Sequence, residues 1–540
     1  MEWVTADIPV GGHDQRRGRG LIVDIIGDRL PTAAPARAGR REWVGLAVLA
    51  LACLVYAMDL TVLHLAVPMI SADLHPTGSQ LLWIIDIYGF MVAGLLITAG
   101  TLGDRLGRRR MLLFGAALFS LVSIVAAFAP SAEILILCRA LLGIAGATVA
   151  PSTLSLIFDM FADRRQRSLA VGVWVGAFST GGAVGPIVGG VLLEHFWWGS
   201  VFLLAVPVMG LLLVLGPMVL PEYRDPTAGR LDPLSTALCV ATMLAVVFGM
   251  KKIAQDGPGV VAVGALGAGL LLGAVFVRRQ LTGAAPMLDL RLFRLPTFRY
   301  ALLINVVGVF VAFGYFLFVA QYLQLVLGLS PWQAGVMMAP SGLAFIVGSQ
   351  AAPRLVRVVR PAYLVGGGLL TAGIGLLLMT RLAADGGAGL AVAAALISSL
   401  GLAPVFGITT EIVVGSAPPQ QAGAASGVSE TGAELGGALG ISILGSISVA
   451  IYRGDLNTTL PDGLAPAQRD DVRDTLGAAA RVAAELPAAT GEAVLTAARA
   501  AFLHGVHLTA GLAGVCALVI GVFALRRLRH LPAGELDAGH

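Results

Sequence analysis

Fourteen long apolar stretches, separated by short charged or Pro/Gly-containing segments, dominate the pattern of the chain. Each stretch has about the length, roughly 20 residues, that a helix needs to cross the hydrocarbon core of a bilayer. The pattern therefore predicts an all-α, polytopic membrane protein with fourteen transmembrane helices. We place them at about 43–70, 80–100, 111–129, 133–158, 168–193, 199–219, 232–250, 258–277, 299–327, 332–353, 361–381, 389–415, 421–450 and 502–525.

Composition supports a membrane protein and excludes several functions. The 540 residues are 57% hydrophobic and 13% charged, whereas a soluble domain is about 25% charged. The net charge of +4 does not indicate a nucleic-acid partner, because the few charges follow the predicted topology. Lys251 and Lys252 are the two lysines, and neither stands in a Gly-Lys-Ser/Thr phosphate loop, so we do not expect ATP-driven transport. The cysteines lack zinc-site spacing, and we expect no metal and no cofactor.

The basic residues predict the orientation. Arginines gather in alternate loops, for example at 105–110 and 354–360, while the short loops of the other side carry only Lys251, Lys252 and Arg381. Because cytoplasmic loops carry the excess of Lys and Arg, we predict that both termini are cytoplasmic. We expect a multi-pass protein of the cell (inner or plasma) membrane.

The spans are arranged as an internal repeat. Six spans at each end flank an extra pair, and a short basic loop follows the second span of each six, which predicts two related six-helix bundles. A long outer loop at 451–501, Ala-rich from about residue 467, could form surface helices. The predicted organisation is a cytoplasmic tail at 1–42, an N-terminal bundle at 43–220, an inserted helix pair with flanking loops at 221–298, a C-terminal bundle at 299–530 and a cytoplasmic tail at 531–540.

A few charges fall inside the spans, where each costs roughly 2.5–3.5 kcal/mol unless it has a partner or faces a cavity. Asp59 and Arg139 should lie at matching depths, so we expect them to pair, either as a static ion pair or as a proton switch. Glu430 and Glu434 share a helix face near mid-membrane, where they should line a cavity and share a proton. Asp86 is either an interfacial carboxylate or a charge partner for a cationic substrate or a proton.

Aromatic side chains near these charges could stack on a lipophilic cation. Packing against neighbouring helices or anchoring at the membrane interface is the alternative role for each of them. The candidates are Trp83, Tyr88, Trp174, Phe178, Tyr315 and Tyr322.

Two glycine-containing segments are candidates for conformational gating. The first, GTLGDRLGRRR at 100–110, is either a topology anchor or a latch between helices that breaks during alternating access; its candidate residues are Gly103, Asp104, Arg105, Gly107 and Arg108. The second is the fifth span, where small residues four apart allow close helix packing and a proline kinks or stiffens the face. This face is either plain packing or a seal at the seam of the two bundles, and it consists of Gly181, Gly185, Pro186 and Gly189.

These motifs together resemble the major facilitator superfamily and, within it, the fourteen-helix drug:proton antiporters. The segment 100–110 resembles the signature loop between the second and third helices of the family. LCRALLGIAGA at 137–147 resembles its fourth-helix motif, and the glycine pattern over 172–190 resembles the fifth-helix pattern of antiporters. MDLTVLHLAVP at 58–68, WIIDIYGFMVAG at 83–94 and SETGAELGGALG at 429–440 are similar to the subgroup that exports quaternary ammonium compounds and dyes.

The resemblance implies a proton-coupled multidrug efflux antiporter, not an enzyme, that exports lipophilic, cationic compounds such as quaternary ammonium compounds, dyes and antibiotics. The proton gradient would drive it, with proton coupling at Asp59, Arg139, Glu430 and Glu434, and substrate binding at Asp86, Glu434 and the aromatic candidates. Its partners would be these substrates, protons and the lipid bilayer, and we expect a monomer. Two alternatives stay open: a same-fold exporter of one endogenous metabolite, lipid or antibiotic, and a non-transporting membrane sensor.

Overall fold

The computed structural model describes residues 37–222, 224, 231–283, 290–418 and 421–533. Most of both predicted tails, residues 1–36 and 534–540, lies outside the described residues. The described part contains helices and no strand. Within these residues, fourteen helical segments are long and apolar enough to cross a membrane, which confirms the predicted number.

The spanning segments agree with the predicted runs to within several residues, except near residue 488. They are α2 (Arg40–Leu74), α3 (Gly78–Leu106), α4 (Arg108–Ala127), α5 (Ala132–Met160), α6 (Arg164–His195), α7 with α8 (Ser200–Leu203 and Ala205–Val219), α9 (Pro233–Asp256), α10 (Val260–Thr282), α11 (Pro296–Gln321) with the π-helix η2 (Tyr322–Val326), α12 (Pro331–Leu355), α13 (Pro361–Met379), α14 (Ala388–Gly415), α15 (Ala422–Thr459) and α18 (Ala488–Arg527). A 3-10 helix, η1 (Leu290–Arg294), precedes α11.

Local sequence signals fix where several of these helices begin. The side chains of Thr77, Ser131, Asp163, Asp232 and Ser330 accept a hydrogen bond from the backbone amide three residues later. Each thereby satisfies an amide that has no partner in the first turn of α3, α5, α6, α9 or α12. Polar capping residues between apolar runs therefore separate the spans.

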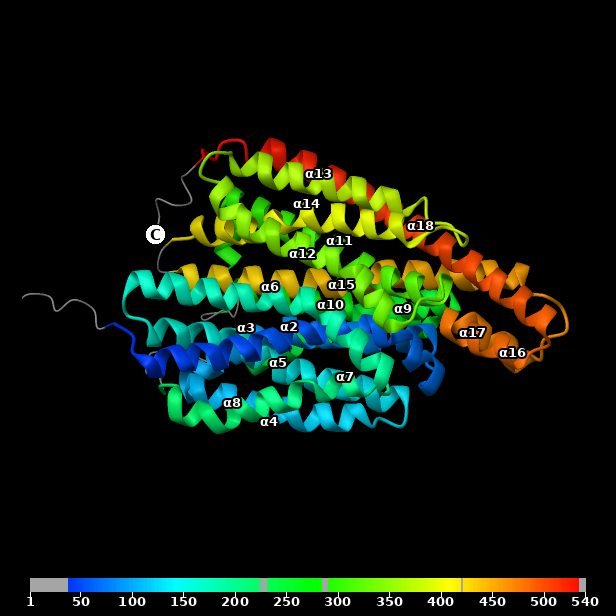
Figure 1. The fold of residues 1–540 in the computed structure, drawn as a ribbon. Coiled ribbons are helices and arrows are strands. Elements are labelled where there is room, and N and C mark those ends of the chain that lie inside the picture. Colours follow the sequence, from blue (N-terminus) through cyan, green and yellow to red (C-terminus); the bar gives the residue numbers. More distant parts are fainter. Residues whose placement is uncertain (1–36, 223, 225–230, 284–289, 419–420, 534–540) are drawn as a thin grey trace, which may run out of the picture.

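The helices form two groups. Helices α2 to α6 and α8 pack on one another, and helices α11 to α15 and α18 do the same; Figure 1 shows these groups as the lower and upper halves of the molecule. The halves meet where α6 packs on α12, α3 on α15 and α2 on α11. The pair α9–α10 packs on α3 and α15 through α9.

The two ends of the described chain lie at the same side of the molecule (Figure 1). We call this side the terminal face and the opposite side the far face. At the far face, helices α16 (Pro466–Asp474) and α17 (Leu476–Glu485) stand between α15 and α18, and α17 packs on α2. The expected surface helices are confirmed, but the predicted loop is too long: α15 continues to Thr459 and α18 begins at Ala488. Alanine is the strongest helix former, so the Ala-rich segment extends α18.

The seam between α6 and α12 is tight toward the far face and open toward the terminal face. A methyl group at Gly190 would lie 2.8 Å from the Pro331 carbonyl oxygen. At the other end, an open cleft of about 860 Å³ is bordered by Gly172 of α6 and Gln350 of α12. The two halves therefore close against each other on the far side of the molecule.

Candidate functional site

A central cavity of about 280 Å³ lies between the two halves. Its wall is largely apolar, with a few charged or polar side chains from α3, α5, α11, α14 and α15. The lining residues are Leu60, Ile85, Asp86, Gly89, Arg139, Asn305, Val309, Phe313, Phe345, Phe406, Thr410, Ala433, Glu434, Gly437, Ala438 and Ile441.

A second cavity of about 130 Å³ adjoins the first. Phe313, Phe345 and Phe406 line both cavities. Two of the predicted aromatic residues, Phe178 and Tyr315, line the second one, which we call the phenylalanine cavity. The combined space offers carboxylates at one end and aromatic rings at the other.

Glu434 of α15 lines the central cavity, and the Tyr56 hydroxyl of α2 donates a hydrogen bond of 3.1 Å to its Oε1. This bond joins the two halves of the molecule. Glu430 stands one turn earlier on α15 and is half-buried. Within the described residues neither glutamate forms an ion pair. The lining of the central cavity includes Glu434 but not Glu430, so the expectation that both glutamates line this cavity is wrong for Glu430. A cation inside the cavity would therefore meet the uncompensated carboxylate of Glu434.

Asp59 and Arg139 form the expected pair. Arg139 Nη1 of α5 lies 2.6 Å from Asp59 Oδ2 of α2, with side-chain exposures of 1% and 10%. Arg139 Nε also donates a 3.1 Å hydrogen bond to the Ile84 carbonyl, and the guanidinium carbon lies 4.6 Å from the centre of the Tyr88 ring. Three helices therefore hold this arginine, and its remaining surface reaches the central cavity.

Asp86 has a partner that the sequence did not suggest. Lys251 Nζ of α9 lies 2.8 Å from the Asp86 carboxylate, and Ser442 Oγ of α15 donates a second hydrogen bond of 2.8 Å. The prediction that Lys251 lies in an outer loop is wrong, since α9 continues to Asp256 and buries it. The lysine ends the apolar run in the sequence, yet the helix carries it into the protein interior.

The remaining aromatic candidates lie outside the linings of these two cavities. The Trp83 ring covers Lys251 Nζ at 3.8 Å from the ring centre, and the Tyr88 ring lies under Arg139. Trp174 Nε1 donates to Thr153 Oγ1, and the Tyr322 hydroxyl donates to the Ala383 carbonyl. Trp83 and Tyr88 therefore support the buried cations of the site.

The turn between α3 and α4 holds the 100–110 motif at the terminal face. Asp104 Oδ1 lies 2.5 Å from Arg108 Nη2, so the pair links the end of α3 to the start of α4. Gly107 adopts a φ of +113°, which favours glycine. Gly103 packs on the Arg108 side chain, and Arg105 is exposed. All of these contacts lie within the N-terminal half.

The same turn is held by a carboxylate that sequence reasoning missed. Glu222, just after α8, lies 3.4 Å from Arg109 Nε and 3.6 Å from Arg110 Nε. Arg109 Nη1 also donates a 3.0 Å hydrogen bond to the Leu220 carbonyl. An acid just after the sixth span, on the same side of the membrane as the run of arginines that begins the third span, is a signal that could have revealed it.

The glycine face of α6 packs within its own half. Methyl groups at Gly181, Gly185 and Gly189 would meet α2, which is the plain helix packing that was one of the two alternatives for these glycines. The seam is formed by a neighbouring face, where the Pro186 carbonyl meets Gly335 of α12. Residues four apart share a face, but the sequence does not say which neighbour that face contacts.

The described residues contain no group of three His, Cys, Asp or Glu side chains able to hold a metal ion. Among the described residues, twelve of the fourteen membrane-length helices form two halves and the other two form the pair α9–α10, and a charged cavity lies at the junction of the halves. This is the architecture of a secondary membrane transporter.

Comparison with known proteins identifies the family. Residues 49–441 match the family model of the Major Facilitator Superfamily, and the chain belongs to this family of transporters. It is 44% identical to the multidrug efflux pump LfrA of Mycolicibacterium smegmatis, over 92% of this chain and 99% of LfrA. It is 35% identical to the methyl viologen resistance protein SmvA of Salmonella typhimurium, over 89% of this chain and 98% of SmvA.

The fold is also similar to a solved structure. The inward-facing, unoccupied crystal structure of a bacterial homologue of the human lysosomal transporter Spinster has a TM-score of 0.61 at 18% identity. The match covers 91% of this chain and 99% of that chain. At this identity the likeness establishes the shared fold.

Proposed function

We propose that the protein is a proton-coupled multidrug efflux antiporter that exports lipophilic cations. The observation that carries the proposal is Glu434, a carboxylate without an ion-pair partner in the described residues, in the wall of an otherwise largely apolar cavity. Such a site attracts positive charge and at the same time shelters apolar surface. The similarity to proteins named a multidrug efflux pump and a methyl viologen resistance protein supports this substrate class.

The two adjoining cavities suit the two parts of such a substrate. The cationic group would lie near Glu434, and its aromatic or apolar body would lie among Phe313, Phe345 and Phe406. Ring faces attract cations and flat apolar groups. Among the described residues, the largely apolar walls of the two cavities do not hold a set of hydrogen-bond donors and acceptors that would select one substrate shape. This suits a pump with several substrates.

Protons and substrate would compete for the same negative charge. A proton on Glu434, or on the Glu430/Glu434 pair, removes the charge that holds the cation, and the cation in turn disfavours the proton. The buried Asp59–Arg139 pair is the second proposed coupling site, since protonation of Asp59 would release Arg139. Entry of protons from outside would thereby drive release of the substrate to the outside.

The terminal face is proposed to be cytoplasmic. The excess of arginine in the loops of this side supports that orientation, and so does the cleft beside Gly172, which opens there. The closed seam at the far face would then separate the cavity from the outside. Substrate would enter from the cytoplasm or the inner leaflet.

The test is proton release on addition of substrate to proteoliposomes. Wild-type protein should release protons when ethidium is added, whereas Asp59→Asn and Glu434→Gln should not. Glu492→Gln, an exposed carboxylate on α18, should behave as wild type. Unchanged proton release in both cavity-side variants would refute the coupling, and absence of ethidium binding by the wild type would refute the substrate class.

A further inference from the structure

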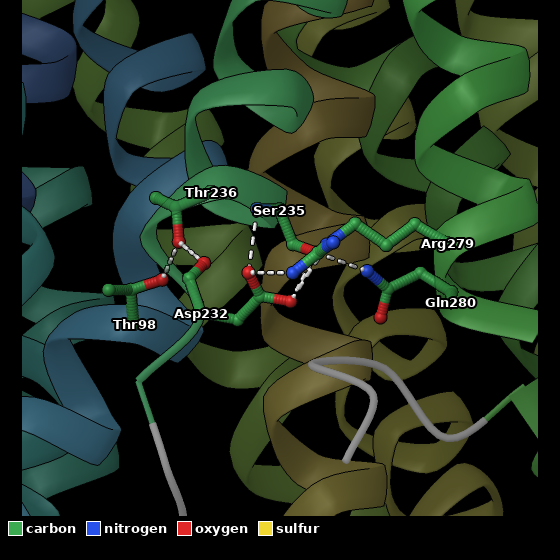
Figure 2. Close-up of polar contacts among 6 residues, drawn as sticks. All are labelled: Thr98, Asp232, Ser235, Thr236, Arg279 and Gln280. Atoms are coloured by element: carbon green, nitrogen blue, oxygen red, sulfur yellow. Dashed lines mark hydrogen bonds and ion pairs between the residues drawn. The ribbon is translucent and has the colours of Figure 1, made fainter. Parts of the chain in front are cut away.

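The inserted pair α9–α10 is fixed at the terminal face by a polar cluster (Figure 2). Arg279 of α10 donates to Asp232, with its Nη2 3.0 Å from Oδ1, and to Ser235 Oγ at 3.0 Å. Gln280 Nε2 donates to the same Ser235 hydroxyl at 2.9 Å. The hydrogen bonds from Arg279 and Ser235 lower the pKa of Asp232 to about 2, so the carboxylate stays charged and the pair stays joined at physiological pH.

The same end of α9 is attached to α3. The hydroxyls of Thr98 and Thr236 lie 2.7 Å apart (Figure 2). Further along, a methyl group at Gly94 would lie 2.6 Å from Val240 Cγ2, so the two helices approach closely. Helix α9 also packs on α15. Helix α9 therefore lies against the junction between α3 of one half and α15 of the other, and these contacts hold it there.

Toward the far face, α9 places one side chain into this junction. Lys251 reaches Asp86 of α3, which also accepts the hydrogen bond from Ser442 of α15. The exposures of the Lys251 and Asp86 side chains are 1% and 0%, and Trp83 covers the ammonium group. The N-terminal half, the C-terminal half and the inserted pair thus meet at the Asp86 carboxylate.

The charges around the central cavity divide into paired and unpaired groups. Arg139 is paired with Asp59, and Lys251 is paired with Asp86. Asp86 and Glu434 both line the cavity, but only Asp86 has a lysine or arginine against it in the described part of the chain. A substrate cation can therefore use Glu434 at once, whereas it meets an Asp86 already occupied by a cation of the protein.

We propose that Lys251 is a specificity-determining residue: a built-in counter-ion by which the inserted pair neutralises Asp86 and so makes the cavity favour singly charged over doubly charged cations. This inference rests on the proposed function. It gives the inserted pair a role in substrate selection. It follows that removing the ammonium group exposes a second carboxylate to the cavity, and that a doubly charged cation gains more from this than a singly charged one.

The experiment measures equilibrium binding of two matched probes to the purified full-length protein. Ethidium and propidium share a phenanthridinium ring, and propidium carries a second, quaternary ammonium charge. In Lys251→Met, the affinity for propidium relative to ethidium should rise by about tenfold or more, because a new pair of opposite charges forms in a site of low dielectric. Lys252→Met is the control, since Lys252 pairs with Asp256 on its own helix and is 41% exposed; it should leave the ratio unchanged.

The double variant Asp86→Asn/Lys251→Met keeps the test decisive even if the single variant unfolds. It removes both charges of the Asp86–Lys251 pair, so neither residue is left as an unpaired buried charge, and its propidium-to-ethidium ratio should return to the wild-type value. An unchanged ratio in folded Lys251→Met would overturn the proposal. Loss of ethidium binding in the double variant would also overturn it, because Asp86 would then bind the substrate directly. Failure of the wild type to bind ethidium would instead refute the proposed function.

Discussion

The Tyr56 hydroxyl donates a 3.1 Å hydrogen bond to the Glu434 carboxylate, and this bond runs from α2 in one half to α15 in the other. The Tyr56 ring also packs on Tyr88, with ring centres 6.1 Å apart, and Tyr88 in turn lies under Arg139. The carboxylate sites at Glu434 and at Asp59 are thereby connected through two tyrosine rings. The orientation of one site thus depends on the packing of the other.

Tyr56→Phe should weaken cation binding without unfolding the protein. The ring packing is kept, but the hydrogen bond that orients the Glu434 carboxylate is lost, which costs about 1 kcal/mol, or about fivefold in affinity. Binding of ethidium to the detergent-solubilised protein measures the effect. Affinity equal to that of the wild type would show that the hydroxyl does not orient the carboxylate.

The Asp59–Arg139 pair allows a static role to be separated from proton coupling. Arg139→Gln leaves Asp59 buried without its cation and should destabilise the protein by about 3–5 kcal/mol, whereas Asp59→Asn/Arg139→Gln should recover most of this loss. Thermal unfolding of the purified variants measures both. If the recovered double variant still releases protons on substrate addition, the pair is only structural; we expect that it does not.

The fold could be predicted because one physical quantity decides it. The thickness of a bilayer sets the length of each apolar run, and the rise of 1.5 Å per residue sets the depth of each charge. The pairing of Asp59 with Arg139 follows from depth alone, and the structure confirms it. The family motifs, which combine residues from several helices, predicted the superfamily in the same way.

Lateral neighbours could not be predicted, because hydropathy describes depth but not direction. The charge of Lys251 ends an apolar run, and this pattern predicts a loop although the residue lies in α9. The position of α9 against the junction of α3 and α15 is set by tertiary packing, which hydropathy does not describe. The contacts of Tyr56 and Ser442 could not be predicted for a similar reason, since a hydroxyl in an apolar run has no pattern that marks its partner.

Gly107→Ala should destabilise the turn between α3 and α4 for two reasons. The φ of +113° is unfavourable for alanine, and its methyl group would collide with the Glu222 carboxylate. Gly257→Ala is the matched control, because Gly257 has a φ of +82° and open space around it. The control should cost about 1–3 kcal/mol and Gly107→Ala more, measured by thermal unfolding. Equal losses of stability in the two variants would show that the Glu222 side chain moves aside without a cost in free energy.

The last prediction concerns the contact between α6 and α2. A methyl group at Gly181 would collide with the Leu54 carbonyl oxygen, which is backbone and cannot rotate away. Gly181→Ala should therefore push α6 and α2 apart and cost about 1–3 kcal/mol in stability. In Gly172→Ala the added methyl group meets nothing within 4 Å, and alanine favours the helix by about 0.5–1 kcal/mol. Unfolding midpoints that move in opposite directions in the two variants are expected, and a Gly181→Ala protein as stable as the wild type would contradict the close packing of α6 on α2.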